Sequence, residues 1–159
     1  MKQRCAPRIY VALLLLLLAL PSTVLAAQGY EVSATYIRVF GDGSAEVLVL
    51  IEVSEPPQRI ALRLLAQPLY IEAYSDGQPV PVDVSGATAY LIATGSNVTV
   101  RYITTGLTSK EGEYWVLKFV CVSETSVILP ENAYVLEIAP ENFSVALVNS
   151  TVALVFPLG

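Results

Sequence analysis

The residue types that carry most protein chemistry are scarce in this chain. Its 159 residues include no histidine, and the two cysteines are Cys5 and Cys121. Ser-His-Asp and Cys-His catalysis, and zinc, haem or iron–sulfur sites, all need side chains that the sequence does not supply. Cys121 is expected to be a small buried hydrophobic side chain. We therefore expect no catalytic residue, no metal site and no cofactor.

Carboxylates are the remaining candidates for catalysis. A glycosidase needs two carboxylates about 5–10 Å apart across a cleft, and Glu111 and Glu113 are close in sequence. Asp42 and Asp76 each precede a glycine, so the conformation of a turn explains why an aspartate stands at each position. These acids lack further oxygen ligands at the spacing of a calcium loop. The chain is accordingly predicted not to be an enzyme.

The best candidate for a binding surface is the polar segment Thr108–Glu113, which leads into Tyr114 and Trp115. Loops carry function more often than strands do, and tyrosine and tryptophan can stack on sugars or anchor a protein partner. The candidate surface consists of Lys110, Glu111, Glu113 and Tyr114. The interpretation that we favour is a solvated turn followed by a tryptophan that belongs to the core.

Three sites match the acceptor pattern for N-glycosylation. They are Asn97, Asn142 and Asn149, each followed two residues later by serine or threonine. All three fall at predicted turns, where an acceptor is accessible. They are glycosylation candidates if the host has the machinery.

The N-terminal segment predicts where the protein works. Three basic residues precede the apolar run Ile9–Ala27, which would measure about 28 Å as a helix. Pro21-Ser22-Thr23 interrupts the run, and small residues follow it. Residues 1–27 are therefore predicted to be a signal peptide cleaved after Ala26 or, as a second choice, after Ala27, or an N-terminal membrane anchor. In both cases residues 28–159 lie outside the cytoplasm, secreted or anchored to the outer face of the membrane.

The charge of the exported part limits its partners. Without the three basic residues of the leader, six basic residues face fourteen acidic ones, which gives a net charge of about −8. Nucleic acids and anionic lipids both need a basic surface. We expect no nucleic-acid partner, and contact with a membrane only through residues 9–27 if the leader is retained.

Alternating hydrophobicity predicts strands throughout residues 28–159. The expected strands are Tyr30–Phe40, Ala45–Glu55, Arg59–Leu65, Leu69–Tyr74, Val80–Val84, Thr88–Thr94, Val98–Thr104, Tyr114–Val122, Val127–Leu129, Ala133–Ile138, Phe143–Val148 and Val152–Phe156. Tyr114–Val122 is apolar on both faces, so it is expected to be a central strand covered on both sides. Turn residues recur every 8–12 positions, as in β-sandwiches. The predicted fold is all-β, an antiparallel sandwich of about 9–12 short strands after a signal helix.

Four features of the sequence stand out together: the leucine-rich leader, the predicted strands rich in tyrosine and valine, the sequons and the lack of histidine. In these features it resembles uncharacterised exported or membrane-anchored β-sandwich proteins of archaea. The segment Leu107–Trp115 is the most motif-like part. The resemblance implies an exported β-sandwich and brings no catalytic residue with it.

The main functional hypothesis is a non-enzymatic domain with a structural or adhesive role at the cell envelope. One alternative is a filament subunit that assembles by strand addition, which requires the strand in residues 28–40 to leave its own sheet. Another is a carbohydrate-binding module or hydrolase, which predicts Tyr70, Tyr74, Tyr90 or Trp115 exposed beside a carboxylate. Protein partners or self-association through strand edges are also expected.

Overall fold

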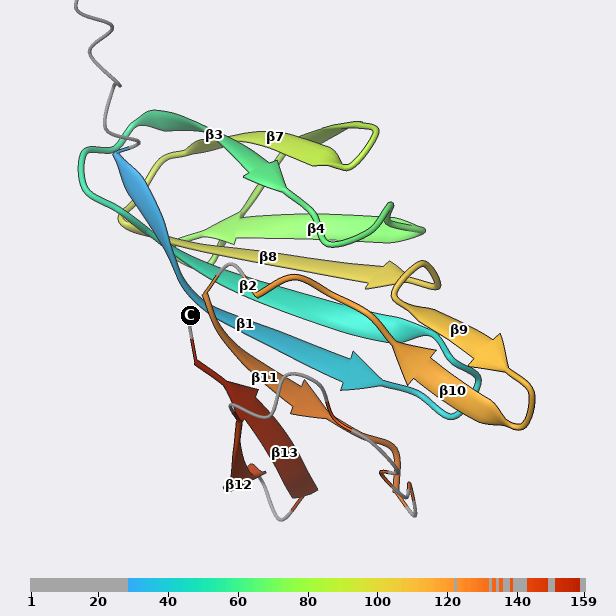
Figure 1. The fold of residues 1–159 in the computed structure, drawn as a ribbon. Coiled ribbons are helices and arrows are strands. Elements are labelled where there is room, and N and C mark those ends of the chain that lie inside the picture. The colour runs from blue at the N-terminus through green and yellow to red at the C-terminus, as the bar shows by residue number, and fades with distance from the viewer. Residues whose placement is uncertain are drawn as a thin grey trace, which may run out of the picture.

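The computed structural model of the chain contains strands and no helix in the part that it describes (Figure 1). The described residues are 29–121, 123–131, 133, 135, 138, 143–148 and 151–157. The predicted leader, residues 1–27, lies outside them, as do most of Ala133–Ile138 and the sequons at Asn142 and Asn149. Over the described ranges, no helix has the length and apolar character needed to cross a membrane. The all-β class predicted from the sequence is confirmed.

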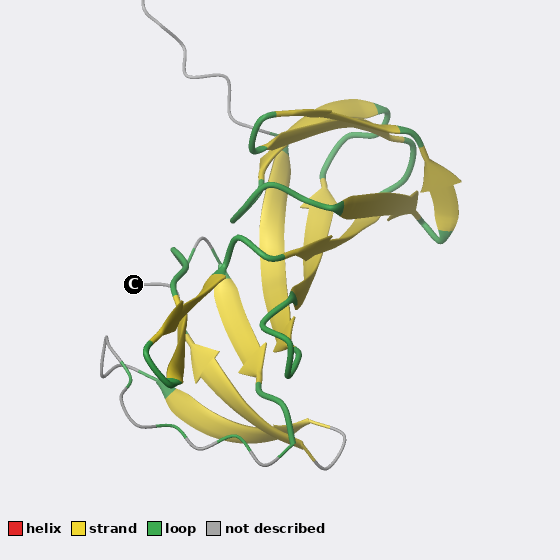
Figure 2. Cartoon of the chain, turned by 90° about the vertical axis from the view of Figure 1, so that its right-hand side faces the viewer, coloured by secondary structure: helices red, strands yellow, loops and turns green. Residues whose placement is uncertain are grey.

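The strands belong to three sheets (Figures 1 and 2). Their bounds are β1 Tyr30–Val39, β2 Ala45–Val53, β3 Gln58–Arg63, β4 Tyr70–Ser75, β5 Gln78–Val80, β6 Val82–Ser85, β7 Thr88–Ala93, β8 Asn97–Thr104, β9 Thr108–Glu111, β10 Tyr114–Leu117, β11 Glu124–Ile128, β12 Ser144–Val148 and β13 Thr151–Phe156. The large sheet has the order β12-β13-β11-β1-β2-β8-β4-β5. A three-stranded sheet has the order β3-β7-β6, and β9 and β10 form a separate pair.

The alternation within β2 shows why the large sheet has one buried face. Val47, Val49 and Ile51 are buried, while the residues between them are only partly covered. Apolar side chains of the three-stranded sheet, such as Ile60 and Leu91, belong to the same core cluster. Burying each valine or isoleucine contributes roughly 1.5–3 kcal/mol. The shared core therefore fixes which face of the large sheet points outward.

Two details of the fold differ from the sequence-based prediction, and one prediction is confirmed. The structure has thirteen strands among the described residues, not 9–12, because Thr108–Glu111 forms the additional strand β9 and Val80–Val84 is divided into β5 and β6. Pro81 stands between these two strands and has no N–H to donate. The pairing is not wholly antiparallel, since β1 and β11 run parallel from Ala34↔Glu124 to Arg38↔Ile128. The strand predicted at Arg59–Leu65 is confirmed by β3.

The prediction that Tyr114–Val122 forms a central strand is wrong. The strand β10 ends at Leu117 and pairs only with β9. Trp115 is 49% exposed and so is not a core residue; its ring packs against Gly43, where an added Cβ would overlap it. The apolar character of this segment serves to cover a turn and to place Phe119 and Cys121 at the margin of the core.

Candidate functional site

The face of the large sheet that points away from the core carries the candidate site, and we call it the outer face. Its side chains alternate with the buried ones along four neighbouring strands, and the pairing registers place them side by side. They are Tyr36 and Arg38 of β1, Glu46, Leu48 and Leu50 of β2, Thr99, Arg101 and Ile103 of β8, and Tyr70, Glu72 and Tyr74 of β4. The outer face thus combines aromatic, charged and aliphatic groups.

Two tyrosines flank a carboxylate on β4. Because the side chains of a strand alternate, Tyr70, Glu72 and Tyr74 all point to the outer face. The Tyr70 hydroxyl donates a hydrogen bond to Glu72 Oε2 at 2.8 Å, and the Tyr74 hydroxyl donates to the same oxygen at 3.3 Å. Tyr70 is 54% exposed, and Tyr74 is partly exposed. The two rings are therefore oriented by one carboxylate while part of their surface remains open to solvent.

Arg101 joins this group to β2. Its guanidinium lies 3.1 Å from Glu72 Oε1 and 2.5 Å from Glu46 Oε1. Hydrogen bonds from Tyr70 and then Arg101 hold the pKa of Glu72 below its ordinary value, and the bond to Glu46 is the largest cause that raises the pKa of Arg101. The bond to Glu72 likewise raises the pKa of the Tyr70 hydroxyl. Glu72 is therefore a charged hydrogen-bond acceptor and a poor proton donor near neutral pH.

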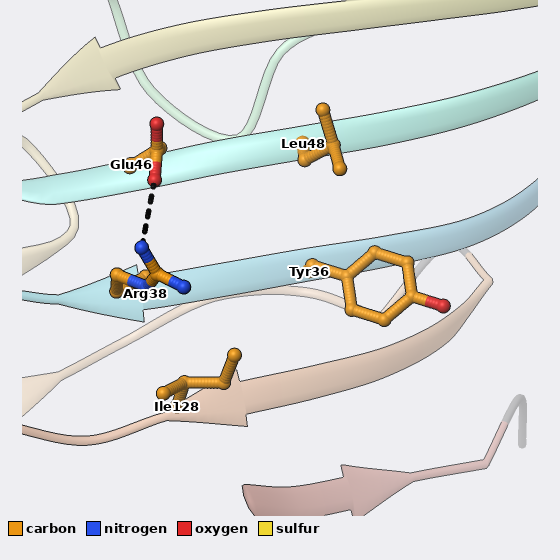
Figure 3. Close-up of a pocket in the computed structure, with 5 residues that line it drawn as sticks. All are labelled: Tyr36, Arg38, Glu46, Leu48 and Ile128. Atoms are coloured by element: carbon orange, nitrogen blue, oxygen red, sulfur yellow. Dashed lines mark ion pairs between the residues drawn. The ribbon is translucent and has the colours of Figure 1, made fainter. Parts of the chain in front are cut away.

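A shallow hollow of about 240 Å³ lies beside these residues (Figure 3). It is lined by Tyr36, Arg38, Glu46, Leu48 and Ile128, from the adjacent strands β2, β1 and β11. Arg38 Nη1 lies 3.8 Å from Glu46 Oε2, too far for a hydrogen bond. The hollow therefore offers aliphatic and aromatic walls next to a cation that is only loosely paired.

The outer face carries side chains that can contact a ligand. Within the described ranges, no group of three or more metal-binding side chains is placed to hold an ion. Exposed tyrosine rings can stack on a ligand, and paired charges can orient its hydroxyl or ionic groups. Since the pKa of Glu72 is lowered, this carboxylate does not have the raised pKa that a glycosidase acid requires.

The binding surface predicted from the sequence lies elsewhere, on the hairpin formed by β9 and β10. Lys110, Glu111, Glu113 and Tyr114 are all exposed there. Glu111 forms an ion pair with Lys118 at 3.0 Å. The hairpin is held to the turn between β1 and β2, where the Thr108 hydroxyl donates to the Gly43 carbonyl. The structure thus brings these four residues together, but apart from the tyrosines of β4.

Among the sequons, only Asn97 lies in the described part of the chain. It is exposed at the first position of β8, and its side-chain amide donates to Asp76 Oδ1 at 3.2 Å. The backbone N–H of Asn97 donates to the same oxygen at 3.0 Å, and these bonds hold the pKa of Asp76 below its usual range. Glycosylation of Asn97 remains a prediction. The amide nitrogen that would carry the glycan is bonded to Asp76 in the structure.

The four aromatic residues named for the carbohydrate-binding alternative occupy three sheets. Tyr70 and Tyr74 share β4, Tyr90 lies on β7 with Arg59 stacked 5.5 Å from its ring centroid, and Trp115 lies on β10. The carboxylate beside the tyrosines is Glu72, which sequence reasoning missed. Its position two residues from each tyrosine was the available signal, because alternate residues of a strand share a face.

The filament alternative required β1 to be free to leave its sheet. The structure places β1 inside the large sheet, paired with β2 on one side and β11 on the other. Withdrawal of this strand would break both pairings. Strand exchange through β1 therefore has no support, and self-association through the sheet edges remains a prediction.

Comparison with known proteins gave similarity to solved structures only, since no protein family and no curated protein matches the sequence. An M1 zinc metallopeptidase from Deinococcus radiodurans is 16% identical, with a TM-score of 0.45, over 81% of this chain and 39% of the other. An aminopeptidase N family protein from Idiomarina loihiensis is 12% identical, with a TM-score of 0.40, over 77% and 29%. Yeast LTA4 hydrolase is 10% identical, with a TM-score of 0.38, over 79% and 26%.

The three similar structures are those of enzymes, whereas the sequence predicted a non-enzymatic structural or adhesive domain. The prediction relied on the lack of histidine, which excludes zinc–histidine chemistry by these 159 residues but says nothing of other domains. The chain spans less than two fifths of the length of these neighbours. Because their TM-scores are below 0.5, the neighbours assign no activity to this chain. Neither the predicted structural or adhesive role nor the predicted absence of enzymatic activity is retained.

Proposed function

We propose that the outer face of the large sheet binds carbohydrate, with Tyr70 and Tyr74 as stacking platforms and Glu72 as a hydrogen-bond acceptor. The observation that carries the proposal is the exposed Tyr70 ring held beside the Glu72 carboxylate by a 2.8 Å hydrogen bond. This is the arrangement that a carbohydrate-binding surface was predicted to have. The proposal also includes the architecture: a sandwich of two unequal sheets, in which one face of the large sheet is presented to the ligand.

The geometry suits a sugar because it combines apolar and polar contacts in one place. A tyrosine ring offers an apolar surface to the C–H groups of a sugar, while a carboxylate accepts hydrogen bonds from its hydroxyls. The two oxygens of a carboxylate offer about four acceptor sites. Tyr70, Tyr74 and Arg101 use three of them. One site on Glu72 therefore remains for a ligand hydroxyl.

The platform is also fixed before the ligand arrives. Glu72 receives bonds from two tyrosines on its own strand and from Arg101 on β8, so none of these side chains has to be ordered on binding. Preorganisation of this kind lowers the entropic cost of association. We place this binding outside the cytoplasm, as the leader segment predicts, on a secreted or membrane-anchored domain.

Calorimetric titration of the purified domain with neutral oligosaccharides tests the proposal. Tyr70→Ala removes the most exposed ring of β4 and should weaken binding about tenfold, which corresponds to about 1.4 kcal/mol. Tyr70→Phe keeps the ring but loses its bond to Glu72, so its effect should be smaller.

Tyr114→Ala is the matched control, since Tyr114 is 61% exposed on the separate β9–β10 pair. Its affinity should equal that of the wild type. If Tyr114→Ala loses binding while Tyr70→Ala retains it, the ligand binds the hairpin and the proposed site is wrong. Circular dichroism confirms that each variant keeps its β structure.

A further inference from the structure

We infer that the ligand of the outer face is an acidic oligosaccharide. Arg38 binds a carboxylate of this ligand, while another of its sugar rings stacks on Tyr70. This inference rests on the proposed carbohydrate binding and adds the charge and the direction of the ligand. It is carried by three features: a cross-strand row, a loosely paired guanidinium and the hollow beside it.

Tyr70 and Arg38 lie at two positions of one row that crosses the large sheet. Tyr70 pairs with Ile103, Ile103 with Glu46, and Glu46 with Arg38. Residues in register across a sheet project to the same face. Three strand spacings separate the two ends, or about 14 Å. The row therefore matches an extended oligosaccharide that runs across the strands, and it is too long for a single sugar ring.

Arg38 has donors to spare for an anion. Glu46 is engaged by Arg101 at 2.5 Å, through both Nε and Nη2, and its contact with Arg38 is a 3.8 Å ion pair without a hydrogen bond. The Arg38 side chain is 55% exposed, whereas that of Glu46 is 16% exposed. A guanidinium binds a carboxylate through two parallel N–H donors. A ligand carboxylate can therefore pair with Arg38 without displacing the bond between Arg101 and Glu46.

The hollow gives the anion and its sugar ring a place to lie. Figure 3 shows Arg38 between Glu46 on one side and Ile128 on the other, with Tyr36 and Leu48 beside them. The aliphatic and aromatic side chains can contact the apolar surface of a pyranose ring. They also exclude water from one side of the ion pair, which strengthens it. The acidic charge of the domain as a whole confines this attraction to the immediate surroundings of Arg38.

The test compares a galacturonate trimer with the same trimer after methyl esterification, which removes the charge and keeps the sugar. The wild-type domain should bind the acid about tenfold more tightly than the ester. Arg38→Ala should remove this preference, because it should weaken binding of the acid much more than binding of the ester. Tyr70→Ala should weaken both ligands by similar factors. Arg63→Ala, on β3 of the other sheet, is the control and should bind both as the wild type does.

Arg38→Lys separates charge from geometry, because lysine keeps the charge and loses the two-pronged donor. Its preference for the acid should lie between those of the wild type and Arg38→Ala. Equal affinity of the wild type for acid and ester, or an unchanged preference in Arg38→Ala, overturns the inference while leaving neutral sugar binding intact. Failure to bind either trimer or any neutral oligosaccharide overturns the proposed function itself. Equal affinity for an oligoglutamate peptide shows an anion site without carbohydrate recognition and also overturns the inference.

Discussion

The hydroxyl of Tyr102 accepts a hydrogen bond from the backbone N–H of Leu65 at 3.0 Å. Tyr102 is fully buried in β8, and Leu65 follows β3, so this bond connects the large sheet with the three-stranded sheet. A buried polar group that is left without a partner costs about 1–3 kcal/mol. The bond therefore secures one sheet against the other.

Tyr102→Phe should lower the free energy of unfolding by about 1–2 kcal/mol, because the Leu65 N–H loses its partner. Urea denaturation followed by circular dichroism measures the change. Tyr90→Phe is the control, since no hydrogen bond of the Tyr90 hydroxyl occurs among the described residues, and it should change stability by less than about 0.5 kcal/mol. An equal loss in both variants would contradict the role given to the Leu65 bond.

The same hydroxyl predicts a loss of stability in alkali. Burial raises the pKa of Tyr102 to about 12, above the value near 10 expected in the unfolded chain. The folded state therefore holds this proton more tightly, and the associated stability is complete below about pH 10 and lost as the pH rises through about 12. The loss should be on the order of 2–3 kcal/mol.

Denaturation at pH 8, 10 and 11.5 checks this expectation, with Tyr102→Phe as the comparison. The variant lacks the titrating group, so the stability of the wild type relative to the variant should fall between pH 10 and 11.5. Parallel pH profiles of the two proteins would show that Tyr102 titrates as it does in the unfolded chain.

Gly95→Ala should destabilise the fold by about 1–3 kcal/mol. A Cβ at Gly95 would overlap the Asp76 carboxylate, which accepts bonds from the N–H groups of Ser96 and Asn97. Asp76 would have to move and release the start of β8. Gly41→Ala, at a position with open space, should be nearly neutral in the same thermal or urea unfolding experiment. Comparable destabilisation by both alanines would rule out the Asp76 contact as the cause.

The fluorescence of Trp115, the single tryptophan, reports on the attachment of the β9–β10 hairpin. Gly43→Ala introduces a Cβ that overlaps the indole ring, so the ring should leave the turn and its emission should shift to longer wavelength. Gly77→Ala is the matched control, because both glycines have positive φ, 83° and 78°, but Gly77 has open space around it. A shift of the same size in Gly77→Ala would show that the emission shift of Gly43→Ala arises from backbone strain and not from the overlap with the indole ring.

Much of the strand content could be predicted because each strand buries every second side chain. The alternation in β2 and the Asp76-Gly77 turn, which joins β4 to β5 with Asp76 at a φ of 45°, follow from local rules. The β9–β10 hairpin was missed since Thr108–Glu111 has no apolar residue to mark a strand. Two contacts between distant parts of the chain hold it in place: the Trp115 ring packs on Gly43, and the Thr108 hydroxyl donates to the Gly43 carbonyl.

Only one part of the candidate site could be predicted from the sequence. The spacing of Tyr70, Glu72 and Tyr74 follows from strand geometry and could have been read directly. The row from Tyr70 to Arg38 could not, because it depends on three pairing registers, and a shift of one residue in any of them would move a side chain to the other face. Registers are set by the packing of the whole core.

The parallel pairing of β1 with β11 has a consequence for how the protein reaches its folded state. Ala34 pairs with Glu124, about 90 residues further along the chain, so one edge of β1 stays open during synthesis until the last third has emerged. Contacts between such distant residues make folding slow. An open strand edge in a partly folded chain also invites association with other chains. Truncation before Glu124 is therefore expected to yield aggregates rather than a smaller folded domain.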